Sequence, residues 1–309
     1  MKTTTKIGAL SLALSSTLPA VTTAHWRLEE GSNGADVTAA QDSSGNGLNQ
    51  AGANGSPKYS SNVPGAFIFD PVSNTTSANA LSLDVSLANS RINIANNVAF
   101  NTSFTYEYFI QLTGEPGGYH AYTRRHETDA NRWQLDFDHA ANGAFGRGRA
   151  RFDTPDGDNS NFVVGPQGGA SIPGNQRLWI DTPTGDGNPA SYTGADWADD
   201  GDGVNDIPSW HHVAITFDQN TQELSFYFDY LLSQTRTLAD TDSSGYVHPN
   251  ADIVIGKFGT EYGTYLDEIR YSEGVLSSSQ FLVATNVPEP GTALLGLLGS
   301  LGFLARRRK

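Results

Sequence analysis

A short acidic stretch, DWADDGDGVNDIPSW at 196–210, carries the side chains of this sequence best suited to binding a cation. Its candidate ligands are Asp200, Asp202, the backbone carbonyl group of Val204, and Asp206. Hard oxygen ligands at this spacing suit Ca²⁺, and Gly203 permits the sharp turn that such a loop needs. The match is partial, because Ala198 and Ser209 stand where a full twelve-residue calcium loop has Asp and Glu. We therefore expect a weak calcium site, with turn-capping aspartates in a solvated loop as the alternative.

Aromatic residues accompany this acidic stretch. Tyr192 and Trp197 lie within or just before it, and Tyr246 and Tyr262 fall near other turns. Aromatic ring faces stack on the CH surfaces of pyranose sugars, while Asp and Asn accept hydrogen bonds from the hydroxyl groups. Tyr192 and Trp197 are therefore candidate sugar-binding residues. The alternative is that these rings pack beneath long loops.

Carboxylates that could hydrolyse a polysaccharide form only incomplete patterns. In ETDANR, Glu127 and Asp129 have the right spacing, but Asn and Arg stand where a third carboxylate should follow. In YLDEIR, Asp267 and Glu268 are adjacent, so a regular strand would point them to opposite faces. A retaining glycosidase needs two carboxylates facing one cleft. The sequence therefore predicts no catalytic residues and favours a protein that is not an enzyme.

The histidines and the absence of cysteine limit the chemistry further. His211 and His212 are neighbours, so a regular strand would send them to opposite faces and prevent both from binding one metal ion. No serine nucleophile motif accompanies them, which favours a structural role. The chain has no cysteine, and this excludes disulfides, thiol nucleophiles and thiolate metal ligands.

The elements that must position these residues are strands. Apolar and polar residues alternate in SFTYEYFIQL (103–112), NRWQLDFD (131–138) and ELSFYFDY (223–230), which indicates half-buried antiparallel strands. Turns rich in glycine, asparagine and aspartate separate these and further short apolar runs. Only VLSSSQFLVA, residues 275–284, is typical of a helix, with Ser277 as its cap. The pattern predicts an all-β, two-sheet sandwich.

The last third of the chain resembles the laminin-G-like, concanavalin A-like jelly-roll family. The resemblance rests on SWHHVAITFDQNTQELSFYFDYLL (209–232), DIVIGKFG (252–259) and TYLDEIRYSEGVLSSSQFL (264–282). HWRLEEG (25–31) and DSSGNGLNQAG (42–52) are similar to the opening strand and loop of the family, more weakly. The resemblance implies an antiparallel jelly roll over 25–285. It leaves function open, because this fold hosts lectins, adhesion modules, hydrolases and spacers.

The formal charge of the chain is −14, and six basic residues lie in its two terminal segments. Without those six charges the remainder would carry −20. So acidic a body repels nucleic acid and anionic lipid, and the arginines of GRGRARF at 146–152 do not offset it. We therefore expect no nucleic-acid partner.

The first 24 residues are typical of a secretory signal peptide. Two lysines precede a short apolar run over 7–18, and small residues end the segment at Ala24. Cleavage after Ala24 would leave His25 as the first residue. The alternative is an N-terminus that is simply unstructured.

The C-terminal segment, 286–309, combines three features. Pro288, Glu289 and Pro290 precede an uncharged apolar stretch at 292–305, and four basic residues follow at 306–309. The stretch is short for a bilayer span, which needs about 20 residues. The order resembles the bacterial PEP-CTERM sorting signal, which implies transient insertion into the inner membrane and processing by an exosortase. A permanent short anchor is the alternative.

Together these features predict an exported protein with one jelly-roll domain at 25–285, at the cell surface or secreted after its tail is processed. The expected function is non-catalytic binding or adhesion, with extracellular polysaccharide as ligand and calcium as a possible cofactor. A glycoside hydrolase of the same fold and a structural coat protein without a ligand are the alternatives.

Overall fold

The protein is represented by a computed structural model that describes part of the chain. The described residues are 21–94, 103–113, 119–126, 133–140, 144–152, 178–180, 210–237, 252–256 and 263–286. Nearly all of its regular structure is antiparallel β-strand, arranged in three sheets. The expectation of an all-β, two-sheet sandwich is confirmed, and a smaller third sheet is added to it.

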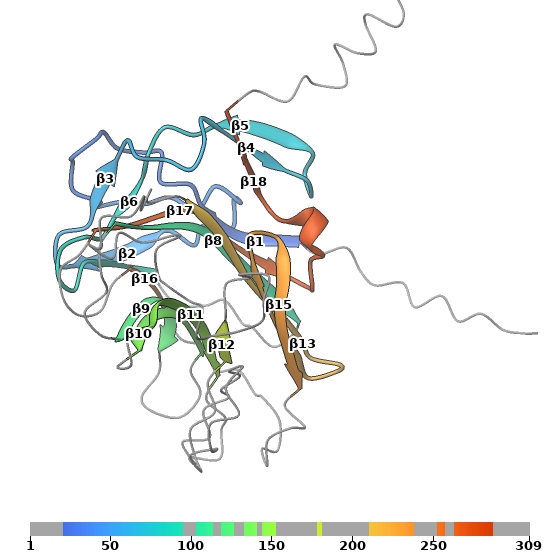
Figure 1. Ribbon diagram of the computed structural model, residues 1–309. Coiled ribbons are helices and arrows are strands. Elements are labelled where there is room, and N and C mark those ends of the chain that lie inside the picture. The colour runs from blue at the N-terminus through green and yellow to red at the C-terminus, as the bar shows by residue number, and fades with distance from the viewer. Residues whose placement is uncertain are drawn as a thin grey trace, which may run out of the picture.

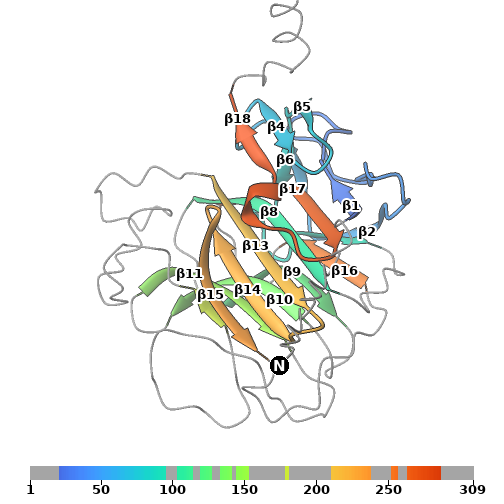
Figure 2. The ribbon, with the colours of Figure 1, turned by 90° about the vertical axis from the view of Figure 1, so that its right-hand side faces the viewer.

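The first sheet contains eight strands. In spatial order they are β15 (Leu231–Thr237), β14 (Glu223–Phe228), β13 (His211–Asp218), β8 (Phe104–Thr113), β17 (Gly263–Glu273), β6 (Ser82–Asp84) and β3 (Lys58–Ser60), and β1 (Val21–Trp26) pairs with β17. Both β8 and β17 are therefore central strands, flanked on each side. Figure 2 shows β13, β14 and β15 continuing this sheet beyond β8 and β17.

The second sheet contains seven strands and faces the first. Its order is β12 (Leu178–Ile180), β11 (Ala144–Phe152), β10 (Trp133–Ala140), β9 (Tyr119–His126), β16 (Asp252–Gly256), β7 (Arg91–Ile94) and β2 (Gln50–Asn54). The third sheet consists of β18 (Val283–Thr285), β4 (Phe67–Asp70) and β5 (Thr75–Ala78). In Figure 1 the first sheet lies between the other two, which makes three layers.

The main core fills the space between the first and second sheets. Alternating residues of β8, β13, β14 and β17 contribute Phe, Tyr, Val, Ile and Leu side chains from one side, and isoleucines of β7 and β16 contribute from the other. Phe104 stacks on Tyr271 with ring centroids 5.6 Å apart. The period-two alternation therefore correctly marks the inward face of the strands at 104–110 and 224–228.

The opposite face of the first sheet is buried as well, which the sequence did not suggest. Thr105, Glu107 and Gln111 of β8 were expected on a solvated face, yet all three are buried. The C-terminal segment covers this face, with Leu276, Phe281 and Leu282 packed against it in two small apolar clusters. The expectation of half-buried strands is therefore wrong for β8, because a layer distant in sequence covers its polar side.

The covering segment contains a helix much shorter than the one expected over 275–284. The structure has a single turn of 3₁₀ helix, η4 (Ser278–Gln280), and then the strand β18. The Gln280 side chain accepts a hydrogen bond from the Ser277 backbone N–H at 3.0 Å, so the expected capping residue does begin the helix. The helix ends at once because Phe281 has extended backbone and turns its ring into the protein.

A buried network of charged groups lies beneath this cover. The Arg270 Nε donates to Glu107 Oε1 at 2.7 Å, and the His212 Nε2 lies 2.8 Å from Glu107 Oε2. The Leu282 backbone N–H donates to the same carboxylate at 2.9 Å. Burial opposes ionisation of Glu107, but Arg270, His212 and this N–H outweigh it and lower its pKa below the ordinary range.

The fold yields a prediction about this network. Arg270→Ala should lower the free energy of unfolding by about 3–5 kcal/mol, because it leaves the Glu107 carboxylate buried without its cationic partner. Chemical denaturation followed by tryptophan fluorescence measures this loss. The double variant Glu107→Gln/Arg270→Met should recover part of it, since position 107 then carries no buried charge, while the partly exposed Asp70 still lacks its partner. Equal stability of Arg270→Ala and wild type would contradict the prediction.

Candidate functional site

An irregularity in β17 gives rise to the candidate site. Asp267 pairs with Phe109 and Arg270 pairs with Glu107, so two residues of β17 stand opposite one residue of β8. This is a β-bulge, and Glu268 adopts a left-handed backbone conformation in it, with φ of 48°. The expectation that a regular strand would send Asp267 and Glu268 to opposite faces is therefore wrong, and both carboxyl groups are fully buried. Strain of this kind, in a residue other than glycine, marks places where a side chain is re-aimed.

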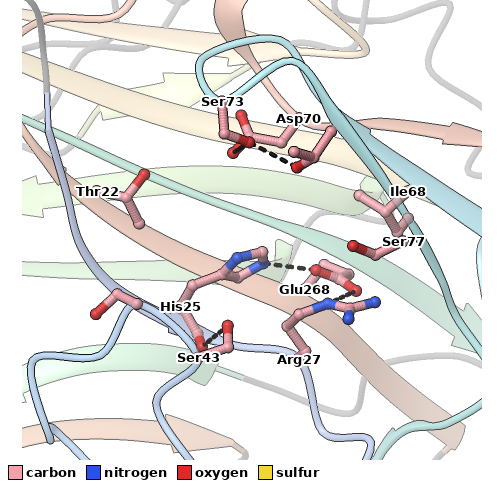
Figure 3. A pocket seen from close by; sticks show the side chains of 11 residues that line it. Thr22, His25, Arg27, Ser43, Ile68, Asp70, Ser73, Ser77 and Glu268 are labelled. Atoms are coloured by element: carbon pink, nitrogen blue, oxygen red, sulfur yellow. Dashed lines mark hydrogen bonds and ion pairs between the residues drawn. The ribbon is translucent and has the colours of Figure 1, made fainter. Parts of the chain in front are cut away.

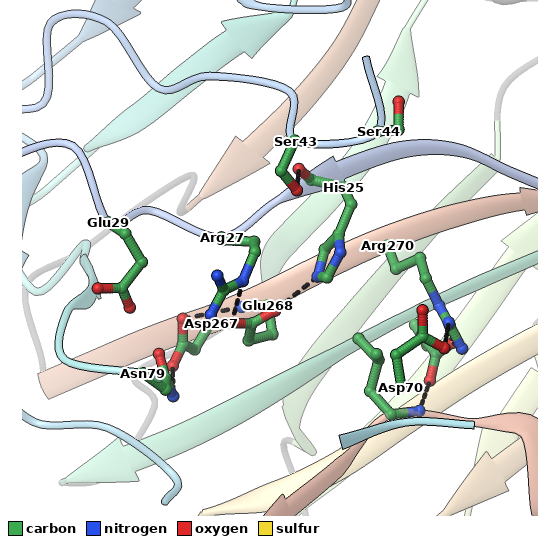
Figure 4. Close-up of polar contacts among 12 residues, drawn as sticks. His25, Arg27, Glu29, Ser43, Ser44, Asp70, Asn79, Asp267, Glu268 and Arg270 are labelled. Atoms are coloured by element: carbon green, nitrogen blue, oxygen red, sulfur yellow. Dashed lines mark hydrogen bonds and ion pairs between the residues drawn. The ribbon is translucent and has the colours of Figure 1, made fainter. Parts of the chain in front are cut away.

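The bulge aims Glu268 at a histidine and an arginine from the N-terminal part of the chain. The His25 Nε2 lies 2.5 Å from Glu268 Oε2, and the Arg27 Nε donates to Glu268 Oε1 at 3.0 Å. β1 runs beside β17 and buries Trp26 in the core, so the alternating residues His25 and Arg27 emerge on the opposite side. Figure 4 shows both side chains converging on Glu268.

Glu268, His25 and Arg27 form the floor of an open cleft with a volume of about 410 Å³. One wall comes from β1 and the loop after it, and the other comes from the β4–β5 hairpin. The remaining lining residues are Thr22, Ser43, Ser44, Ile68, Asp70, Ser73, Thr75 and Ser77. Hydroxyl groups therefore dominate the walls, with charged groups at the floor (Figure 3).

The first wall is held by Asp42. Its carboxylate accepts hydrogen bonds from the backbone N–H groups of His25 at 3.0 Å, Ser44 at 2.9 Å and Leu48 at 3.1 Å. Burial opposes ionisation of Asp42, but the Ser44 hydroxyl and these N–H groups lower its pKa overall. The DSSGNG stretch that resembles the loop of the jelly-roll family thus fixes the position of Ser43 and Ser44.

The second wall is held by Asp70 at the end of β4. Its Oδ1 accepts hydrogen bonds from Arg270 at 2.7 Å and from the Val72 N–H at 2.9 Å, and its Oδ2 accepts one from the Ser73 hydroxyl at 2.8 Å. Burial opposes ionisation of Asp70, but the charge of Arg270 and these hydrogen bonds lower its pKa. Arg270 therefore joins the cleft to the buried network beneath η4.

The chemistry of the cleft favours binding over acid–base catalysis. A glycosidase needs a carboxylic acid that faces the ligand and stays protonated at working pH, whereas Asp70, which lines this cleft, is held ionised by Arg270. Both oxygens of Glu268 already contact His25 and Arg27. What remains for a ligand is a set of hydroxyl groups and fixed charges that can donate and accept hydrogen bonds. Among the residues described, no group of three or more His, Asp or Glu side chains is placed to hold a metal ion.

The calcium, sugar-binding and sorting residues predicted from the sequence are not among the described residues. The expected calcium ligands Asp200, Asp202, Val204 and Asp206, the candidate sugar-binding residues Tyr192 and Trp197, and Pro288, Glu289 and Pro290 all fall outside the described residues. The incomplete hydrolase pattern at Glu127 and Asp129 does as well. Their expected roles are therefore neither confirmed nor contradicted by the structure.

The two histidines of the WHHVA strand are described, and they have structural roles. His212 stacks on Tyr230, with ring centroids 4.7 Å apart, while it contacts Glu107. His211 points away from it, and its Nδ1 lies 2.8 Å from Asp229. This agrees with the expectation of a structural strand.

The sequence reasoning missed the cleft itself. Glu268 and His25 fall in stretches that resemble the jelly-roll family, but the sequence pattern assigned neither of them to a binding site. The serines and threonines of the walls are common residue types that carry no motif. The resemblance to the family covers the stretches with His25, Ser43, Ser44 and Glu268, but it pointed to the fold and not to a cleft.

Comparison with known proteins identifies the C-terminal segment. Residues 286–309 match the PEP-CTERM protein-sorting motif. The chain carries a PEP-CTERM sorting signal. This signal marks proteins exported across the inner membrane to the cell surface, and it implies processing by an exosortase. The expectation of an exported protein is therefore confirmed.

In the part of the chain that the structure describes, no helix is long and apolar enough to cross a bilayer. The apolar stretch at 292–305 falls outside that part.

Solved structures with a similar fold include binding domains of botulinum neurotoxins and of a mosquitocidal protein. The receptor binding domain of botulinum neurotoxin mosaic serotype C/D matches with a TM-score of 0.50 and 12% identity, over 84% of this chain and 49% of the other. The binding domain of Paraclostridial Mosquitocidal Protein 1 matches with a TM-score of 0.48 and 13% identity, over 84% and 50% of the two chains. This chain thus spans about half the length of these domains, and the likeness concerns the fold alone. No curated protein matches the chain significantly.

Asp267, the neighbour of Glu268, has an unusual environment of its own. It is fully buried, and its carboxyl oxygens accept hydrogen bonds from the Asn79 side chain and the Glu268 N–H, each at 2.8 Å. Burial and the charge of Glu268 together raise the pKa of Asp267 well above its ordinary value. Asp267 therefore stays protonated in the folded protein over a pH range in which the unfolded chain has lost this proton.

This gives a prediction for the pH dependence of stability. The contribution of Asp267 is most favourable below its ordinary pKa of 3.8 and is lost as pH rises towards its raised pKa in the folded state. Asp267→Asn mimics the neutral acid, so its melting temperature should exceed that of wild type at pH 8. The difference should shrink towards pH 4. Thermal unfolding across this range measures it, with Asp36→Asn at an exposed position as control. A pH-independent loss of stability in Asp267→Asn would contradict the interpretation.

Proposed function

We propose that this exported protein is a non-catalytic binding module of the cell surface, and that its ligand is an extracellular polysaccharide. The observation that carries the proposal is the hydroxyl-rich cleft between β1 and the β4–β5 hairpin. Export to the cell surface brings this cleft to the place where such polymers are found.

The dimensions of the cleft suit a segment of a glycan. Small-molecule sites typically have volumes of about 300–1,000 Å³, and about 410 Å³ lies within that range. The cleft is open to solvent, so a polymer could enter without threading an end. Sugars present hydroxyl groups that both donate and accept. The Ser43 and Ser73 hydroxyl groups already donate to the His25 carbonyl and to Asp70, so they can accept hydrogen bonds from a ligand, and Ser77 adds a further hydroxyl group. The charges of Arg27 and Glu268 at the floor are paired with each other, which suits a neutral ligand.

Tyr192 and Trp197 are part of this proposal as additional stacking residues, on the sequence pattern alone. Their rings would provide the apolar face that the cleft itself offers only through Ile68.

The rival function, cleavage of polysaccharide, is separated from binding by a direct assay. A glycan array measures binding, and release of reducing ends from the bound polysaccharide measures hydrolysis. Release that disappears in Glu127→Gln would overturn the non-catalytic proposal. Binding without release supports it, and the absence of both favours a structural coat protein.

A substitution that fills the cleft tests its role. Thr75 is exposed and lines the cleft from a β-strand, where tryptophan is well accepted. Thr75→Trp should weaken glycan binding at least tenfold, a loss of about 1.4 kcal/mol, while the melting temperature stays near that of wild type. Leu87→Trp places the same side chain at an exposed position that does not line the cleft, and it should bind normally. Unchanged affinity in Thr75→Trp would place the ligand elsewhere.

We also propose that calcium binds the loop containing Asp200, Asp202, Val204 and Asp206. Calcium bound to this loop would assist the binding of the glycan. Added calcium at millimolar concentration should then raise the melting temperature, because a ligand of the folded state stabilises it. Asp202→Asn together with Asp206→Asn should abolish this rise, and magnesium serves as the control ion. No rise in wild-type protein would remove calcium from the proposal.

A further inference from the structure

The strand β1 begins within the segment that the sequence assigns to the signal peptide. Val21 pairs with Glu273, Thr22 with Ser272 and Ala24 with Tyr271 of β17. The pairing is irregular at Thr23, but the same strand continues through His25 and Trp26, which the sequence assigns to the domain. Four residues expected to be removed, 21–24, therefore belong to the first sheet.

These four residues are integrated into the fold. Ala24 is completely buried and belongs to the main core. The Thr23 backbone carbonyl accepts hydrogen bonds from the Ser44 hydroxyl at 3.0 Å and from the Asn46 side chain at 2.9 Å. Thr22 lines the cleft described above. Their removal would open a space in the core, detach two side chains of the Asp42 loop and delete part of one cleft wall.

Their removal would also change β17. At positions 271–273 this strand lies between β8 and β1, and Tyr271 and Ser272 are almost completely buried. Buried backbone groups require hydrogen-bond partners, and a sheet edge without a partner strand favours aggregation. Residues 21–24 supply that partner strand.

We propose that signal peptidase cleaves between Ala20 and Val21, so that the mature protein begins at Val21 and retains the whole of β1. Ala20 provides the small side chain that the peptidase requires directly before the cleaved bond. Val21 is 61% exposed, so a terminal ammonium group at this position stays hydrated. The proposal moves the end of the expected signal peptide from residue 24 to residue 20.

The competing position after Ala24 has one electrostatic advantage. It would place the new ammonium group of His25 beside Asp42, whose carboxylate lies 3.0 Å from that nitrogen. It also has a small residue, Thr22, three positions before the cleaved bond, where the proposed position has Leu18. Neither advantage replaces the strand pairing and the buried Ala24, which therefore decide between the two positions.

The N-terminus of the exported protein tests the proposal. The full-length chain is produced in a bacterium with an exosortase, the exported form is purified, and its N-terminal peptide is identified by mass spectrometry. We expect the peptide to begin VTTAHW. A peptide that begins HWRLEE, or at any other residue, would overturn the proposal.

Two substitutions sharpen this test. Ala20→Phe removes the small residue before the proposed bond, so the precursor should accumulate in the membrane fraction. Thr22→Glu places a charged residue three positions before the competing bond but leaves the proposed one intact, so the protein should still begin at position 21. Normal processing of Ala20→Phe, or blocked processing of Thr22→Glu, would assign cleavage to Ala24 instead. These readouts do not depend on whether the cleft binds a glycan.

Discussion

The ion pair between Arg270 and Glu107 is the interaction on which the rest of this structure depends. It joins the two central strands of the first sheet, β17 and β8, inside the protein. The Arg270 guanidinium also reaches Asp70 of the β4–β5 hairpin and the Gln280 carbonyl of η4. A buried ion pair is tolerated only when its remaining donors and acceptors are satisfied. The third sheet and the C-terminal segment supply those partners. The buried charge of Arg270 therefore requires the outer layer that these segments form.

The same constraint shapes the cleft. Asp70 accepts from Arg270 and, with Ser73, holds the hairpin wall in position. Within the bulge of β17, Glu268 is held by His25 and Arg27. The charged groups of the cleft are thus held in position by ion pairs with other residues of the protein. A ligand meets groups already in position, which reduces the entropy that binding must overcome.

Much of the fold could be predicted from the sequence, because period-two alternation depends on local residues alone. The inward faces at 104–110 and 224–228 and the structural histidine strand are of this kind. Burial of Glu107 could not be predicted in this way, since its partner Arg270 lies 163 residues away. The bulge at Glu268 could not be predicted either, because it arises from the pairing of β17 with β8 and not from a glycine. The cleft was missed for a related reason: five separate segments contribute to it, and none of them carries a binding motif.

The position of β17 in the first sheet has a consequence for how the chain matures. This strand comes from residues 263–273, near the end of the domain, yet β8, β1 and β6 all pair with it. A chain that crosses a membrane from its N-terminus cannot close its central sheet until those residues have emerged, because loops spanning most of the domain must form last. The sorting segment at 286–309 follows 13 residues after β17 ends. The central sheet can therefore close only after almost the whole domain has crossed the membrane, shortly before the sorting segment follows.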